Sequence, residues 1–181
     1  MRRLLLAAFS FGLAGAWGAS IPRAVPAFKF HLTDGTPVEL SKYRGKVCVV
    51  EFLFTTCPHC QETSKVMSKL NAELGPKGFQ PLGVAFNENA IMLLPDFIRS
   101  FGVNYPTGVA PREKVLEFLG HTSTTRLMVP QVAIIDRKGM IRFQSSVEGD
   151  ENLHGEMSLR QKIQMLLAEG GTAPAAAKKS K

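Results

Sequence analysis

The chain contains only three cysteines and four histidines, and this scarcity excludes several classes of protein. A small scaffold held together by disulfides needs more cysteine pairs than three residues can supply. A structural zinc site needs about four ligands, and the sequence has neither a second closely spaced cysteine pair nor a spaced pair of histidines. Covalent haem attachment is excluded as well, because Gln61 follows Cys60 where a histidine is required.

A surplus of basic residues is missing from the body of the chain. The formal net charge is +7, but Arg2, Arg3 and the lysines within the last four residues carry five of these charges. The remaining body is close to neutral, which argues against a nucleic acid partner. The composition is otherwise that of a globular protein, because 45% of the 181 residues are hydrophobic and 20% are charged. This length suffices for one buried core.

Both ends of the chain are predicted to lie outside the folded body. Residues 1–20 combine a short positive start, an uncharged apolar stretch and small residues, which is typical of a signal peptide or an N-terminal membrane anchor. Either interpretation predicts a periplasmic or other extracytoplasmic location. Residues 169–181 lack core-forming side chains and predict a disordered basic tail. The folded domain is therefore expected at 26–168.

What the sequence does contain is a pair of cysteines three positions apart, Cys57 and Cys60. They follow the apolar run 46–53, which predicts a central strand covered on both faces, and they open the predicted helix 58–74. A cysteine at a helix start faces unpaired backbone N–H groups and the positive end of the helix dipole, and both favour the thiolate. A second thiol one turn later is close enough to form a disulfide with it. We therefore predict a redox-active dithiol with Cys57 as the nucleophile and Cys60 as the resolving thiol.

The rest of the sequence alternates predicted strands and helices. Alternation of apolar residues, turn dipeptides and buried runs predicts strands at 28–32, 37–40, 79–86, 131–136 and 140–145. Helices are predicted through Met92 to Phe101 with Pro95 in the first turn or at a kink, over 112–119, and from a cap at Ser158 through Leu167. This order predicts one α/β domain with a central mixed β-sheet flanked by helices.

Four segments together are similar to the thioredoxin fold, and in particular to its exported TlpA/ResA-like branch of thiol-disulfide oxidoreductases within the redoxin superfamily. They are the hairpin and turn at 34–46, the strand and turn at 51–60, the loop at 129–131, and the hairpin at 134–139. The resemblance implies a thioredoxin fold with an N-terminal β-hairpin and a mid-fold helical insertion. It also implies disulfide exchange with protein substrates, a membrane electron donor or acceptor as a further partner, and no bound cofactor or metal.

Two positions differ from the pattern of this branch. Thr56 stands before the first cysteine, where tryptophan is usual, and Thr63 stands three residues after the second cysteine, where glutamate is common. The first difference argues against the hydrophobic docking surface that is usual in this branch. The second argues against a cytochrome-maturation reductase.

The residues between the cysteines bear on the direction of the exchange. Pro58 and His59 form the dipeptide of the strongly oxidising DsbA type, and Val129 before the proline resembles that type as well. By this resemblance His59 stabilises the Cys57 thiolate and raises the reduction potential of the pair. A solvated histidine on the first helical turn is the alternative. The TlpA/ResA-like body favours a reductase, so the two resemblances predict opposite directions.

Two further residues are expected to support the dithiol. Glu51 lies in the apolar strand six residues before Cys57, where thioredoxin has a buried acid that relays a proton for the second cysteine. Burial would raise the pKa of Glu51 toward neutrality, and an acid at a strand edge that reaches water is the alternative. Pro130 is expected to be cis, as in the family, with the Val129 backbone available to an extended substrate. A trans proline at a strand start is the alternative.

Two other functions compete with disulfide exchange. A thiol peroxidase of peroxiredoxin type requires proline seven residues and threonine three residues before the attacking cysteine, and Val50 and Phe54 occupy these positions before Cys57. A copper-binding chaperone could use both cysteines with a histidine. The third cysteine, Cys48, lies inside the apolar run and is expected to be a buried small hydrophobic residue.

Overall fold

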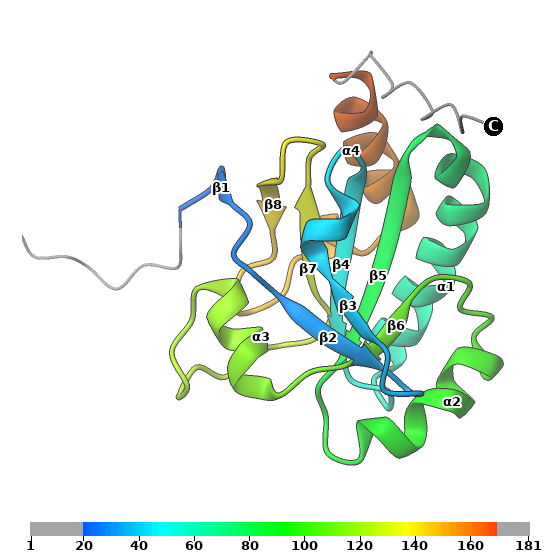
Figure 1. Cartoon of the computed structure of the whole chain (residues 1–181), viewed down its shortest axis with the longest axis vertical. Coiled ribbons are helices and arrows are strands. Elements are labelled where there is room, and N and C mark those ends of the chain that lie inside the picture. Colours follow the sequence, from blue (N-terminus) through cyan, green and yellow to red (C-terminus); the bar gives the residue numbers. More distant parts are fainter. Residues whose placement is uncertain (1–19, 170–181) are drawn as a thin grey trace, which may run out of the picture.

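The computed structural model of the protein describes residues 20–169 (Figure 1). These residues form one sheet of eight strands in the order β1-β8-β7-β4-β5-β6-β2-β3, together with four α-helices. The strands are β1 (Arg23–Ala24), β2 (Lys29–Leu32), β3 (Pro37–Glu39), β4 (Val47–Leu53), β5 (Phe79–Ala85), β6 (Thr107–Val109), β7 (Gln131–Ile135) and β8 (Met140–Gln144). The helices are α1 (Pro58–Leu74), α2 (Ala90–Ser100), α3 (Arg112–Leu119) and α4 (Glu156–Ala168), with short 3-10 helices η1 (Leu40–Tyr43), η2 (Gly75–Lys77) and η3 (Glu151–Leu153).

Strand β4 lies at the centre of the sheet. It pairs in parallel with β5 and antiparallel with β7, and all seven of its residues are buried. The predicted central strand and the predicted mixed sheet flanked by helices are both confirmed. Because β4 is held on both edges and both faces, its carboxyl end is a rigid support for the turn that follows.

Alternate side chains of β4 belong to two different cores. Val47 and Val49 pack with α1 and α4, whereas Cys48, Val50 and Phe52 pack with the N-terminal hairpin and α3. This division follows from the pleat of a strand, in which successive side chains point to opposite faces. Figure 1 shows α1 and α4 together in one layer, with the β2–β3 hairpin and α3 on the other side of the sheet.

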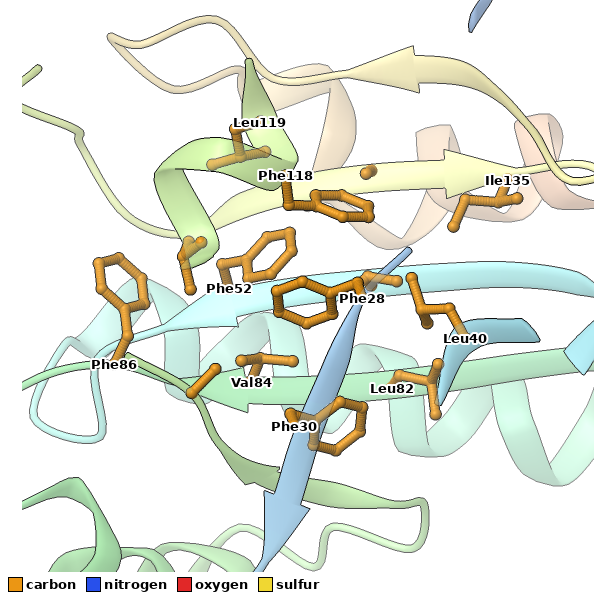
Figure 2. Packing of buried hydrophobic residues seen from close by; sticks show 14 of the residues in the cluster. Phe28, Phe30, Leu40, Phe52, Leu82, Val84, Phe86, Phe118, Leu119 and Ile135 are labelled. Carbon is orange, nitrogen blue, oxygen red and sulfur yellow. The ribbon is translucent and has the colours of Figure 1, made fainter. Parts of the chain in front are cut away.

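Three phenylalanines fasten the hairpin and α3 to the centre of the sheet. Figure 2 shows the rings of Phe28, Phe52 and Phe118 next to one another. The ring centroid of Phe28 lies 5.6 Å from that of Phe52, and the centroid of Phe118 lies 5.1 Å from both. Burial of each such side chain contributes roughly 1.5–3 kcal/mol to stability. The N-terminal hairpin is therefore an integral part of the core.

The mid-fold insertion that the resemblance implies consists of α2 and β6, between β5 and α3. Strand β6 pairs in parallel with β5 and antiparallel with β2, so it joins the hairpin to the rest of the sheet. The approach of β6 to β2 requires glycine at Gly108, because a Cβ there would lie 2.1 Å from the carbonyl oxygen of His31.

Most of the predicted helix boundaries agree with the structure. Helices α1 and α3 span 58–74 and 112–119 as predicted. Pro95 lies inside α2, beyond its first turn. The prediction that Ser158 caps the last helix is wrong: α4 begins earlier with Gly155 as its N-cap, and the Ser158 hydroxyl donates from within the first turn to a backbone carbonyl of η3.

The predicted leader at 1–20 and the predicted tail at 169–181 fall outside the described residues, apart from Ser20 and Glu169. Glu169 directly follows α4 and forms an ion pair with Arg142, with 2.7 Å between Oε2 and Nη1. Among residues 20–169, no helix has the length and hydrophobicity needed to cross a membrane.

Candidate active site

The dithiol lies where the rigid end of β4 meets the start of α1. Cys57 is the N-cap residue of α1, and Pro58 occupies the first helical position, where the missing N–H of proline costs nothing. The Cys57 side chain is half-buried, whereas Cys60, one turn along, is fully buried. Both are free thiols. Burial, the nearby charge of Glu51 and a hydrogen bond with the Cys57 side chain raise the pKa of Cys60 well above its ordinary value. The pair therefore combines one accessible sulfur with one protected sulfur.

The loop before β7 contacts the accessible sulfur. The peptide bond between Val129 and Pro130 is cis, as the sequence predicted. Antiparallel pairing places Gln131 opposite Phe52, so the start of β7 is fixed beside the end of β4. As a result, the Cys57 Sγ lies 3.6 Å from the carbonyl oxygen of Val129 and donates to it.

The shape of this loop is held by one buried side chain. The Nε2 of Gln131 donates to the carbonyl oxygens of Met128 and Ser146, both at 2.8 Å. Within the described residues, the N–H of Val129 has no acceptor, and its carbonyl oxygen accepts only from the Cys57 thiol. In this part of the chain, the backbone of Val129 therefore has an unpaired N–H and a carbonyl oxygen in contact with Cys57.

A buried carboxyl group lies behind the dithiol. Glu51 is completely inaccessible to solvent, and burial raises its pKa to about 8. The Ser64 hydroxyl donates to Oε2 at 2.8 Å, and the Tyr105 hydroxyl lies 3.5 Å from the same oxygen. Both hydrogen bonds favour the ionised carboxylate and so limit the rise of the pKa. Among residues 20–169, no hydrogen-bond donor reaches Oε1.

Two histidines flank the exposed side of the dithiol. His59 is exposed on the first turn of α1, and its ring centroid lies 6.4 Å from that of His154, which follows η3. Partial burial and the neighbouring His59 lower the pKa of His154. The sequence offers no motif that singles out His154, and only the fold brings its ring close to that of His59.

Comparison with known proteins identifies the family of the chain. The Redoxin family model matches residues 22–160. The chain belongs to the Redoxin family.

The redoxin is similar to several proteins of known name. It is 27% identical to the thiol-disulfide oxidoreductase ResA of Bacillus subtilis (strain 168) over 124 residues, which cover 67% of this chain and 69% of the relative. It is 35% identical over 63 residues to a protein of Xenopus laevis named probable glutathione peroxidase 8-A, across 34% of this chain and 30% of the relative. A thiol:disulfide interchange protein of the thioredoxin family from Chlorobium tepidum TLS superposes with a TM-score of 0.68 at 23% identity, covering 82% of this chain and 99% of that one.

The family, the fold and the named relatives together confirm the central prediction. The redoxin is a thiol-disulfide oxidoreductase with a thioredoxin-like fold. The resemblance to the TlpA/ResA-like branch of the family is confirmed as well.

Sequence reasoning missed several residues of the redoxin site. Ser64 and Tyr105, the two partners of Glu51, were not singled out. Asn87 was also missed: its Oδ1 accepts from the N–H of Thr55 at 2.9 Å and so holds the turn before the dithiol. One signal was available, because Ser64 lies four residues after Cys60 on the buried face of the helix, where a small polar side chain needs a buried partner.

The remaining predicted features lie around the redoxin site or away from it. Thr56 is exposed next to a groove of about 190 Å³, which α2 lines with Leu93 and Phe97. Cys48 lies at the other end of β4 and is buried as predicted, and burial raises the pKa of its thiol to about 12. Within residues 20–169, no group of three or more histidine, cysteine or acidic side chains is arranged to hold a metal ion.

Proposed function

We propose that this redoxin is an exported enzyme that exchanges disulfides with protein substrates through Cys57 and Cys60. The observation that carries the proposal is the position of the Cys57 sulfur, between the buried Cys60 thiol and the carbonyl oxygen of Val129 at 3.6 Å. An incoming sulfur atom can reach Cys57 from solvent but cannot reach Cys60. Attack therefore begins at Cys57, and resolution begins at Cys60.

The exchange proceeds in two displacements. In the reducing direction, the Cys57 thiolate attacks a substrate disulfide, forms a mixed disulfide and releases the first substrate sulfur as a thiolate. Cys60 then loses its proton and attacks the Cys57 sulfur, which forms the Cys57–Cys60 disulfide and releases the second substrate sulfur. Two electrons pass from the dithiol to the substrate, and each released thiolate takes a proton. The oxidising direction is the reverse of these steps.

Glu51 is the proposed acceptor of the Cys60 proton. Two observations support this role. Within residues 20–169 no donor reaches the Oε1 of Glu51, and the charge of Glu51 is close enough to raise the pKa of Cys60. A carboxyl group with a pKa of about 8 can accept and return a proton near neutral pH. Proton transfer to Glu51 also removes the negative charge that disfavours the Cys60 thiolate, so the transfer lowers the barrier to resolution in two ways.

The Val129 backbone is the proposed docking site for the substrate chain. Its N–H lacks an acceptor within the described residues, and its carbonyl oxygen already contacts the Cys57 sulfur. An extended peptide can pair with the Val129 backbone through main-chain hydrogen bonds, which do not depend on the side chains of the peptide. Pro130 and Gln131 hold this backbone in place, which favours protein substrates of varied sequence over a single small molecule.

His59 is the proposed modulator of the reduction potential. His59 lies on the first turn of α1, two residues after the nucleophile, and a positive charge there would stabilise the thiolate and so the reduced form. The equilibrium potential of the dithiol decides the physiological direction. A potential near that of the glutathione pool, or above it, selects oxidation, and a much lower potential selects reduction by a membrane electron donor.

The proposed extracytoplasmic location depends on the leader at 1–20, and the redox partner would then be a membrane protein that meets the domain outside the cytoplasm. Expression with an alkaline phosphatase fused behind residue 169 tests the location, because the reporter folds only in an oxidising compartment. Phosphatase activity is expected with the intact leader, and its persistence after deletion of residues 2–19 would contradict the proposal.

Trapping of a mixed disulfide tests the exchange itself. Cys60→Ser should accumulate mixed disulfides with substrate proteins, and a reductant should cleave these adducts. Cys57→Ser should form none. Cys48→Ser is the matched control, because Cys48 is a buried thiol near the start of β4, away from the dithiol at the start of α1, and this variant should retain wild-type insulin reduction. Adducts through Cys48 in place of Cys57 would refute the assignment.

A thiol peroxidase is the second candidate, because of the 63-residue match to the protein named as a glutathione peroxidase. In that reaction the Cys57 thiolate would attack a peroxide oxygen, and the leaving oxygen would take a proton to give water or an alcohol. Cys60 would then attack the sulfenic acid sulfur of Cys57, form the Cys57–Cys60 disulfide and release water. Rapid consumption of hydrogen peroxide with slow insulin reduction would favour this function. Tight stoichiometric Cu(I) binding without either activity would favour the copper chaperone instead.

A further inference from the structure

A second cavity lies on the face of the sheet opposite α1, remote from the dithiol. It encloses about 640 Å³ and is bounded by the segment before β2, by η1, by one side of α3 and by the first half of β4. Its origin is the shortness of α3. Eight residues of helix extend about 12 Å, whereas the seven residues of β4 extend about 23 Å, so the helix covers only part of the strand.

The floor of the cavity is apolar. Figure 2 shows Phe118 over Phe28, while Leu40 and Ile135 stand farther along the sheet. Cys48 and Ile135 are partners in the β4–β7 register and form the base of the cavity at this end. These side chains line the cavity, and each exposes less than a tenth of its surface to solvent. A volume between about 300 and 1,000 Å³ with mostly apolar walls is typical of sites for small organic molecules.

The charges that line the cavity do not cancel. Lys114 pairs with Glu117 at 2.8 Å, and Asp136 is paired with an arginine of β8 at 3.2 Å. Lys29 and Glu39 lie directly opposite each other in the hairpin register, so their charges cancel in number although no direct ion pair joins them among residues 20–169.

Two cations at the mouth of the cavity remain without a carboxylate partner among residues 20–169. Arg44 donates to the carbonyl oxygen of Lys138 at 3.1 Å, and Lys46 donates to the Oε1 of Gln80 at 3.1 Å. Both acceptors are neutral, so the mouth has a positive surplus above an apolar floor.

We propose that this cavity binds an apolar organic anion, a free single-chain carboxylate, with its hydrocarbon part on Phe28, Leu40 and Ile135 and its carboxylate at Arg44 and Lys46. Apolar walls select the hydrocarbon part, and the two unpartnered cations select the anionic end. The site is independent of the dithiol, because Cys48 and Cys57 lie toward opposite ends of β4. The proposal therefore stands or falls separately from disulfide exchange.

Calorimetric titration of the full chain with decanoate at neutral pH tests the site. Decanoate is expected to bind with a stoichiometry near one, and each added methylene is expected to tighten binding about fourfold until the cavity is full. Decyltrimethylammonium, with the same chain and the opposite charge, is expected to bind at least tenfold more weakly. Equal affinity for the two head groups, or no decanoate binding below its solubility limit, would overturn the proposal. Preference for a two-chain phosphatidylglycerol vesicle over decanoate would overturn it as well.

Three surface variants locate the binding. Arg44→Glu and Lys46→Glu should each weaken decanoate binding by about twofold to fivefold, as expected for loss of an exposed charge partner. Lys42→Glu is the matched control, because it makes the same charge change in the same segment but does not line the cavity, and it should leave the affinity unchanged. Equal effects of all three would show that only net charge matters, which contradicts a defined site.

A filling variant and a spectroscopic readout complete the test. Ala27 lines the mouth and is exposed, so Ala27→Trp should fold and should abolish decanoate binding by obstructing the cavity. Methyl resonances of Leu40 and Ile135 should shift on titration, whereas those of Leu53 and Leu94 near the dithiol should not. Shifts confined to the second pair would place the ligand at the dithiol and refute the proposed site. Insulin reduction by Ala27→Trp should remain at the wild-type rate.

Discussion

Replacement of Ser64 with alanine is expected to shift the pH dependence of resolution to higher pH. The Ser64 hydroxyl donates to Glu51 Oε2 at 2.8 Å inside the protein, and it favours the ionised carboxylate. A hydrogen bond to a charged group contributes about 1.5–3 kcal/mol, and 1.36 kcal/mol corresponds to one pKa unit. Loss of the hydroxyl should therefore raise the pKa of Glu51 from about 8 to roughly 9–10.

This shift has a defined kinetic consequence. At pH 7 a carboxyl group with a pKa of about 8 is ionised in about one tenth of the molecules, and one more unit reduces the fraction to about one hundredth. Ser64→Ala should thus slow resolution at pH 7 about tenfold or more and should recover toward the wild-type rate above pH 9. Stopped-flow measurement of a single turnover with a disulfide peptide, from pH 6 to 10, gives the rate constants. The ratio of the two proteins at each pH cancels every titration that they share.

Two neighbouring variants control the interpretation. Ser68→Ala removes a similar hydroxyl one turn along α1, which bonds only to the Ser64 carbonyl oxygen at 2.9 Å, and it should leave the midpoint unchanged. Tyr105→Phe removes the longer contact with Glu51 and should shift the midpoint in the same direction by less. A uniform rate loss at all pH values in Ser64→Ala would refute the reasoning, because it would indicate a packing defect.

Three more outcomes are expected. Burial raises the pKa of Glu51 above its unfolded value of 4.5, so the stability that its protonated form supports is complete below pH 4.5 and is lost as the pH rises through about 8. In urea unfolding, Glu51→Gln should therefore be more stable than wild type by on the order of a few kcal/mol at pH 9. At pH 4 the two proteins should have nearly equal stability. His59→Pro should make the dithiol more reducing, and an unchanged redox equilibrium with glutathione would contradict the proposed role. Gln131→Ala removes two buried hydrogen bonds to the Met128 and Ser146 carbonyls, so it should destabilise the protein by about 1–3 kcal/mol and raise KM more than it lowers kcat; an unchanged KM would count against the docking role of this loop.

The sequence predicts best the elements whose signals are local. The run of apolar residues that forms β4 and the Gly-Pro pair after α1 bound these elements without reference to the rest of the chain. The start of α4 was misplaced because Ser158 is a typical cap residue, while the observed cap, Gly155, has no side chain to signal it. Strand β1 was not expected, because two residues carry no periodic pattern.

The site was predictable only in part for the same physical reason. The cysteine spacing and the apolar surroundings of Glu51 are visible in one short stretch of sequence. The partners of Glu51 come from α1 and from the loop before β6, and only the packing of those elements brings Ser64 and Tyr105 to one carboxylate oxygen. The cavity beside α3 was not foreseeable at all, since it depends on how far a short helix reaches across a longer strand.

The narrow attachment of the hairpin has a consequence for any attempt to shorten this protein. In the described part of the chain, the β2–β3 hairpin is joined to the other strands of the sheet only through the pairs His31–Val109 and Leu32–Gly108 between β2 and β6. Excision of 87–109 to leave a minimal thioredoxin core would therefore leave one edge of β5 and one edge of β2 without a partner, and two bare strand edges invite intermolecular pairing. Such a truncated protein should self-associate, so the insertion protects two strand edges from intermolecular pairing in addition to packing beside the dithiol.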